Sequence, residues 1–183
     1  MIKHLSALLF SALLAMGATS ASHAACEAEG FVTDAGKAFM GAARSRSAAA
    51  FSGAASRYAD LNAIALFALG ANRSSLPKSR QAEYVALTRA FIGKVLAKNA
   101  GRFRASGISV VSCSGSAKAL TVNTRLSGGQ KLVFKLYKTR GGYRVRDVSV
   151  SSVWLAQQLR TTFASVLRKN GGDIDALFNY LRG

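Results

Sequence analysis

The fold is decided by residues 108–151, which read ISVVSCSGSAKALTVNTRLSGGQKLVFKLYKTRGGYRVRDVSVS. Apolar and polar residues alternate along this stretch, which is the pattern of strands with one buried face. The glycine pairs at 128–129 and 141–142 fit tight hairpins, because glycine adopts the positive φ angles that such turns need. We therefore predict an antiparallel four-stranded meander with strands at Ile108–Cys113, Ala119–Leu126, Gln130–Thr139 and Tyr143–Ser151.

The two faces of this predicted sheet differ in polarity. Leu132, Phe134 and Leu136 alternate with Lys131 and Lys135, so one face is apolar and the other basic. An apolar sheet face has to be covered by other elements of the chain.

Apolar residues at helical spacing predict helices on both sides of the sheet segment. After the sheet, a helix from Val153 to the Gly171-Gly172 stop is followed by a short helix capped by Asp173. Helices, then a sheet, then helices indicate an α+β fold in a single domain. Before the sheet we predict helices over 27–43 and 47–58, a third over 61–69 between an Asp60 cap and a Gly70 stop, and a fourth from Pro77 to Gly101.

Residues 1–24 have the composition of a secretory signal peptide. A basic start with Lys3 precedes an apolar run at 5–16, and the segment ends in Ser22-His23-Ala24, a small-x-small cleavage site. The apolar run is too short to span a bilayer. We predict cleavage after Ala24 and a mature domain of residues 25–183. A retained anchor is the alternative, and a lipoprotein at Cys26 fits less well because no leucine stands three residues before it.

The charge of the chain is strongly positive, with 25 Lys+Arg against 8 Asp+Glu and a formal net charge of +17. Cleavage would remove Lys3 and leave +16. The cations are spread along the sequence, and their plainest role is solubility. Nucleic acid would also fit the charge, but export argues against it. The charge then favours an approach to anionic lipid or to acidic partner surfaces.

Cleavage would also remove both histidines, His4 and His23. That excludes histidine-dependent catalysis and histidine-ligated metal sites from the mature domain. The sequence has no G-x-S-x-G elbow, no phosphate loop and no carboxylate pair that suggests acid–base chemistry. We therefore expect no enzymatic activity, no metal and no cofactor.

Two cysteines, Cys26 and Cys113, would remain in the mature domain. An even pair in an exported protein favours a disulfide over two free thiols, which are the alternative.

Several motifs occur in an order that resembles a known family. YRVRDVSV at 143–150 is followed by Leu155, RTTFASVL at 160–167, Gly171-Gly172 and Leu177. Upstream stand YADL at 58–61, Ile64, Leu69-Gly70, Pro77, Arg80-Gln81 and Glu83-Tyr84. This order and spacing is similar to the MlaC-like family, the toluene-tolerance-type periplasmic phospholipid-binding proteins. The sequence departs from the family pattern at 71–73, at Leu96, at Ser152 and Trp154, and in its cysteine pair.

The resemblance implies an NTF2-like or MlaC-like wedge of sheet and helices around an apolar lipid cavity. It implies a periplasmic shuttle of an Mla-type ABC transport system that maintains outer-membrane lipid asymmetry, with bound phospholipid as its ligand. The implied partners are an inner-membrane complex of an MCE protein and an ABC permease, and an outer-membrane lipoprotein–porin complex. We expect a monomer that binds no nucleic acid. The alternatives are a carrier of another lipid, such as a hopanoid, or a secreted basic adaptor that binds no lipid.

Periodicity supplies the candidate lipid-contacting residues on the sheet and on the helices that flank it. Each of them has ordinary core as its alternative role, because periodicity does not separate core from cavity wall. The candidates are Phe91, Val95, Leu132, Phe134, Leu136, Val148, Val150, Val153, Leu155, Leu159 and Phe163.

Overall fold

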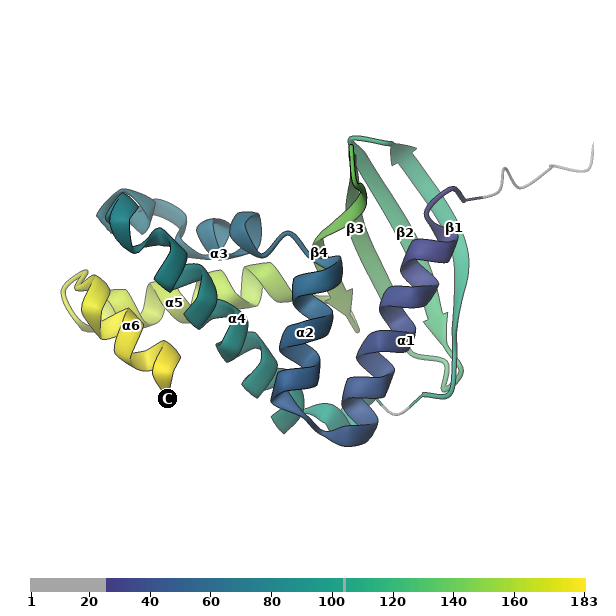
Figure 1. Cartoon of the computed structure of the whole chain (residues 1–183), viewed down its shortest axis with the longest axis horizontal. Helices are drawn as coiled ribbons and strands as arrows, with labels where there is room; N and C mark the ends of the chain where they lie inside the picture. Colours follow the sequence, from purple (N-terminus) through teal and green to yellow (C-terminus); the bar gives the residue numbers. More distant parts are fainter. Residues whose placement is uncertain (1–25, 104) are drawn as a thin grey trace, which may run out of the picture.

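A single antiparallel sheet forms one end of the computed structural model, which describes residues 26–103 and 105–183 (Figure 1). The predicted signal peptide lies outside the described residues. Strand order follows the sequence, and each strand is antiparallel to the next. The predicted meander is therefore confirmed, with one short strand added. The strands are β1 (Ile108–Ser116), β2 (Ala119–Leu126), β3 (Lys131–Thr139), β4 (Gly142–Val150) and β5 (Val153–Trp154).

The additional strand β5 arises from the two-residue turn that follows β4. Ser151 and Ser152 both adopt positive φ angles, of 49° and 68°. Such a turn folds the chain straight back, so that Val153 pairs with Val150. The predicted helix start at Val153 is therefore wrong by two residues. Two residues are too few for alternation to reveal a strand.

A bulge interrupts β4 at Arg146. Lys135 pairs with Asp147 and Leu136 pairs with Val145, so Arg146 is the extra residue. An inserted residue shifts the alternation of the strand by one. Val145 and Val148 consequently both face the inner side of the sheet.

The six predicted helices are all present. Asp60 and Asp173 cap their helices as predicted, since their carboxylates accept hydrogen bonds from the amides of Ala63 and Asp175. Pro77 is not the first residue of its helix, because it is extended and a 3-10 turn, η2 (Lys78–Arg80), intervenes. The helices are α1 (Glu29–Ser45), α2 (Ala48–Tyr58), α3 (Leu61–Leu69), α4 (Gln81–Lys98), α5 (Leu155–Lys169) and α6 (Ile174–Arg182), with further 3-10 turns η1 (Gly70–Ser75) and η3 (Ala100–Phe103).

The helices are arranged in two groups (Figure 1). Helices α1 and α2 lie in front of the sheet, whereas α3, α4, α5 and α6 pack together beside it. None of the described helices combines the length and the apolar composition needed to cross a bilayer.

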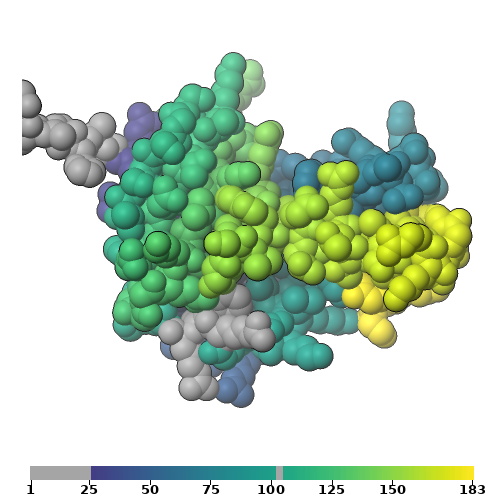
Figure 2. Space-filling model, turned by 180° about the vertical axis from the view of Figure 1, so that it is seen from behind, coloured from purple at the N-terminus to yellow at the C-terminus, as the bar shows by residue number. Residues whose placement is uncertain are grey.

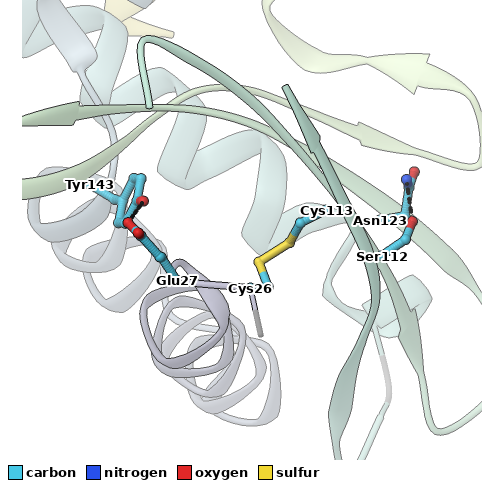
Figure 3. The surroundings of a disulfide bond; sticks show 6 residues. All are labelled: Cys26, Glu27, Ser112, Cys113, Asn123 and Tyr143. Carbon is cyan, nitrogen blue, oxygen red and sulfur yellow. Dashed lines mark hydrogen bonds between the residues drawn. A yellow bond between two sulfur atoms is a disulfide. The ribbon is translucent and has the colours of Figure 1, made fainter. Parts of the chain in front are cut away.

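Helix α1 is joined to the sheet by a disulfide between Cys26 and Cys113, whose Cα atoms are 5.8 Å apart (Figure 3). The predicted pairing is thus present. Beside it, the Glu27 carboxylate accepts hydrogen bonds from Lys138 and Tyr143, which lower the pKa of that carboxyl. Further along the helix, Gly36 lies so close to β1 that a Cβ there would be 2.7 Å from Ile108 Cγ2. These contacts fix α1 against the inner face of the sheet.

Buried apolar side chains gather in two main clusters. The helical cluster joins α3, α4, α5 and α6, and the sheet cluster joins α1 to the inner face of the sheet. The helical cluster consists of Ala65, Leu66, Ala68, Leu69, Leu76, Tyr84, Phe163, Leu167, Leu177, Phe178 and Leu181. The sheet cluster consists of Ala28, Val32, Met40, Val122, Leu126, Leu132, Phe134, Leu136 and Val145. The core is thus divided where the helical group meets the sheet.

Candidate functional site

A cavity of about 370 Å³ lies between the helical cluster and the sheet cluster. This volume is within the range of about 300–1,000 Å³ that is usual for small-molecule sites. Its lining is dominated by aliphatic and aromatic side chains. The lining residues are Gly36, Phe39, Met40, Phe51, Ala55, Tyr58, Ala59, Leu61, Ile64, Phe91, Ile92, Val95, Leu96, Leu126, Leu132, Phe134, Val145, Asp147, Val148, Val150, Leu155, Ala156, Gln158, Leu159, Thr162 and Tyr180.

The sheet forms one side of the cavity. Leu132 and Phe134 of β3 pair across the strand boundary with Val150 and Val148 of β4. All four face inward, because alternation places every second residue on the same side. The bulge at Arg146 adds Val145 to this surface, so a five-residue apolar patch covers the inner face at β3 and β4.

Helices α4 and α5 form the opposite side. From α5, Leu155 and Leu159 face the cavity at the four-residue spacing of one helix face. From α4, Phe91 borders both the cavity and the helical cluster, since its ring centroid is 5.8 Å from that of Phe163 and 5.4 Å from that of Tyr180. Phe91 is therefore where closed packing ends and open space begins.

Helices α1 and α2 close the cavity at the front. Phe39 and Phe51, one from each helix, both line it and lie 6.2 Å apart between ring centroids. Helix α2 also packs tightly on α4 at Gly93, where a Cβ would lie 2.5 Å from the carbonyl oxygen of Ala48 and closer still to Ser52 Oγ. Only glycine permits this approach of the two helices.

The corner between α2 and α3 is held to the edge of the sheet by Asp60. The Asp60 amide donates to the carbonyl oxygen of Val145 at 2.9 Å. Its carboxylate accepts from the Tyr137 hydroxyl, and this bond raises the pKa of Tyr137. Because the neighbouring residues Tyr58, Ala59 and Leu61 line the cavity, these bonds fix the position of that wall.

Asp147 fixes the start of α5 in the same way. Its Oδ1 accepts hydrogen bonds from the amides of Val148 at 2.8 Å and Ala156 at 2.9 Å. Burial raises the pKa of Asp147, while the two amide hydrogen bonds act in the opposite direction. The carboxylate thus accepts from the amide of Ala156, one of the amides in the first turn of α5 that have no partner within the helix. We assign it a structural role.

The most exposed lining residues, Val95, Gln158 and Tyr180, lie on α4, α5 and α6. They mark the side on which the cavity opens to solvent. Across residues 26–103 and 105–183, no group of three or more histidine, cysteine, aspartate or glutamate side chains could hold a metal ion. An apolar ligand could therefore enter through this opening and be buried in the cavity.

The structure brings eight of the eleven predicted site residues together in the cavity lining. They are Phe91, Val95, Leu132, Phe134, Val148, Val150, Leu155 and Leu159. Their contact with a lipid stays a prediction.

The structure places the other three predicted residues away from the cavity lining. Phe163 is fully buried in the helical cluster, where it packs against Tyr84. Leu136 lies in the sheet cluster, opposite Leu120 on β2. Val153 is 50 % exposed, because the turn that makes β5 carries it to the surface.

Sequence reasoning missed the contribution of the first two helices. Phe39, Met40, Phe51 and Tyr58 have helical spacing, which identifies a buried stripe without saying what it faces. The apolar face of the predicted sheet could have indicated this contribution. The later helices alone do not cover that face, so the first two helices have to pack against it as well.

Comparisons with known proteins agree with this architecture. A family model described as MlaC protein matches residues 34–183. A phospholipid-binding protein from Ralstonia solanacearum, solved in complex with a phospholipid, has the same fold, with a TM-score of 0.72 and 17 % sequence identity. The match covers 86 % of this chain and 96 % of that one. A search of curated proteins found no match.

Proposed function

The chain belongs to the MlaC family, and from this premise we propose that it is a periplasmic phospholipid carrier. The predicted signal peptide exports it, and the mature domain then moves phospholipid between the outer and inner membranes. Its expected partners are an MCE-protein and ABC-permease complex at the inner membrane and a lipoprotein–porin complex at the outer membrane. Such transport would serve to maintain the lipid asymmetry of the outer membrane. The protein acts as a carrier and not as an enzyme.

The observation that carries this proposal is the apolar cavity between the two clusters. Acyl chains are the ligand that such a lining favours, because each buried methylene contributes about 0.8 kcal/mol. The opening beside Val95, Gln158 and Tyr180 would leave a polar headgroup in contact with water. The phospholipid bound by the Ralstonia solanacearum protein of the same fold supports this choice of ligand.

The cavity also weighs against the alternative of a basic adaptor without a lipid site. An adaptor that acts only through its surface has no use for an unfilled interior, since empty apolar space destabilises a fold. A carrier of another lipid, such as a hopanoid, would use the same cavity.

The test is to identify what the protein carries. The exported protein is purified without detergent, extracted with organic solvent, and the extract is examined by mass spectrometry. We expect phospholipid in a fixed ratio to protein. A hopanoid in its place would support the other lipid carrier, and an extract without any lipid would contradict both.

A further inference from the structure

The outer face of the sheet, which points away from α1 and α2, is covered by no helix in the described part of the chain (Figure 2). In Figure 2 the strands form the left part of the visible surface without an element in front of them. Figure 3 shows two residues of this face, Ser112 and Asn123, on the opposite side of the sheet from the disulfide. The uncovered face is therefore the basic one expected from alternation.

Five cations project from this outer face. Arg125 and Lys131 are directly opposite each other on β2 and β3, and Lys135 follows on β3. Arg144 and Arg146 come from β4, and Arg144 also donates a hydrogen bond to the carbonyl oxygen of Arg57 in α2. Asp147 is the one carboxylate in strands β1 to β5, and it accepts two amide hydrogen bonds. None of the five cations has an ion pair among the described residues. Asp147 lies opposite Lys135, and the Asp60 carboxylate binds Tyr137 at one end of the face. Five cations against these two carboxylates leave the face with a net positive charge.

Two of these cations are stacked on aromatic rings of the same face. Lys135 Nζ lies 4.1 Å from the ring centroid of Trp154, and Arg146 Cζ lies 4.3 Å from that of Tyr137. Each cation occupies one face of its ring, which leaves less aromatic surface for stacking on nucleic-acid bases. Tryptophan and tyrosine are, however, the aromatic residues typical of membrane interfaces.

The shape of the face favours a lipid surface over a protein. Tight protein interfaces rely on side chains that fill pockets. None of the five cations lines the apolar cavity or the shallow groove between α3 and α4. The polar side chains of Ser109, Ser114 and Thr121 extend the face beside Arg125. An open face of cations and hydroxyl groups suits a fluid layer of anionic headgroups.

We propose that the outer face of the sheet binds anionic phospholipid bilayers. The sheet that carries this face is also one wall of the cavity, and Trp154 on the face is followed directly by the lining residues Leu155 and Ala156. Contact through this face would bring one wall of the cavity to the membrane. The proposal rests on the proposed carrier function for the choice of a membrane as the occupant.

The test compares two double variants with the same change in net charge. Arg125→Glu with Lys131→Glu alters the outer face, whereas Lys78→Glu with Arg168→Glu alters exposed cations of the helical group. Binding is measured by co-sedimentation with vesicles of phosphatidylglycerol and phosphatidylethanolamine, and with vesicles of phosphatidylcholine alone. Circular dichroism verifies folding, and Lys131→Glu alone serves if the double variant does not fold.

We expect the wild type to bind the anionic vesicles and not the phosphatidylcholine vesicles. Each cation near such a surface contributes about 1 kcal/mol, so the outer-face variant should bind about tenfold more weakly or worse. The control should lose less than about threefold, because screening limits the reach of its charges.

Equal losses in both double variants would overturn the proposal, because they would trace binding to net charge alone. Binding of the wild type to polyglutamate but not to the vesicles would also overturn it, and would assign the face to an acidic protein. The lipid content of the same preparations is measured in parallel. Phospholipid present without vesicle binding rejects this inference alone, and absence of phospholipid rejects the carrier function.

Discussion

The helical cluster and the cavity contain the same kinds of apolar residues, yet one is closed and the other is open. Phe163 and Phe91 show this contrast. Their ring centroids are only 5.8 Å apart. Phe163 is fully buried with Tyr84 and Phe178 around it, whereas Phe91 lines the cavity. On the other side of that cavity, Phe134 also faces open space although its strand pattern is that of ordinary core.

The difference lies in what holds the surrounding elements. In the helical cluster, Arg80 pairs with Asp175 and Glu83 and lies 4.0 Å from the Phe178 ring, which draws α6 onto α4. Around the cavity, hydrogen bonds hold the walls at fixed positions without drawing them together. Asp60 holds the α2–α3 corner and Asp147 holds the start of α5. The cavity is thus maintained by hydrogen bonds at its rim, while each apolar side chain of the lining has one side that meets open space.

The largest effect expected from this contrast concerns the two phenylalanines. Phe163→Ala should destabilise the protein by about 3–5 kcal/mol, because it opens a void in closed packing. Phe91→Ala should reduce the free energy of unfolding by less than about half of that amount, because the Phe91 side chain already borders a cavity. Urea unfolding followed by circular dichroism gives both free energies. Equal losses would mean that the two positions are packed alike.

The contact between α2 and α4 should respond next. Gly93→Ala is expected to destabilise the protein by about 1–3 kcal/mol, since the new Cβ would force α2 away from α4. Gly53→Ala in α2 is the matched control, because a Cβ there meets nothing within 4 Å. It should stabilise the protein by up to about 1 kcal/mol through helix propensity. The same unfolding measurement checks both, and a neutral Gly93 variant would contradict the tight contact.

The smallest effect belongs to the turn that joins the sheet to the cavity wall. Ser152→Gly should stabilise the protein by up to about 1 kcal/mol, because glycine adopts its positive φ without strain. Ser114→Gly, at a position in β1 that does not have a positive φ, should instead destabilise slightly. Thermal unfolding of the two variants decides this, and a decrease in stability for Ser152→Gly would argue against a strained turn.

Much of the fold was predictable because it depends on local patterns. Alternation identified four strands, and aspartates in the right places identified two helix starts at Asp60 and Asp173. The bulge at Arg146 was not predictable, since nothing in the sequence marks which residue of β4 has no cross-strand partner on β3. Simple alternation would have placed Val145 and Asp147 on one face, whereas the bulge places Val145 with Val148.

The cavity was only partly predictable, for a different reason. Whether an apolar side chain faces open space depends on the distance between elements that are remote in the sequence. Phe163 and Leu159 lie on the same helix one turn apart, and only Leu159 reaches the cavity. Val153 was misplaced because a two-residue turn reversed the chain. The place of Phe39 and Phe51 in the cavity lining was missed because it depends on how α1 and α2 pack against each other and against the rest of the fold.

The central claim is that the cavity between the two clusters holds phospholipid. The most direct measurement is the amount of phospholipid per protein in Val150→Glu and Val153→Glu, purified without detergent and shown to be folded. These residues are cross-strand partners, but only Val150 lines the cavity. We predict that Val150→Glu loses its phospholipid while Val153→Glu keeps the wild-type amount. Equal phospholipid in the two folded variants would contradict the claim.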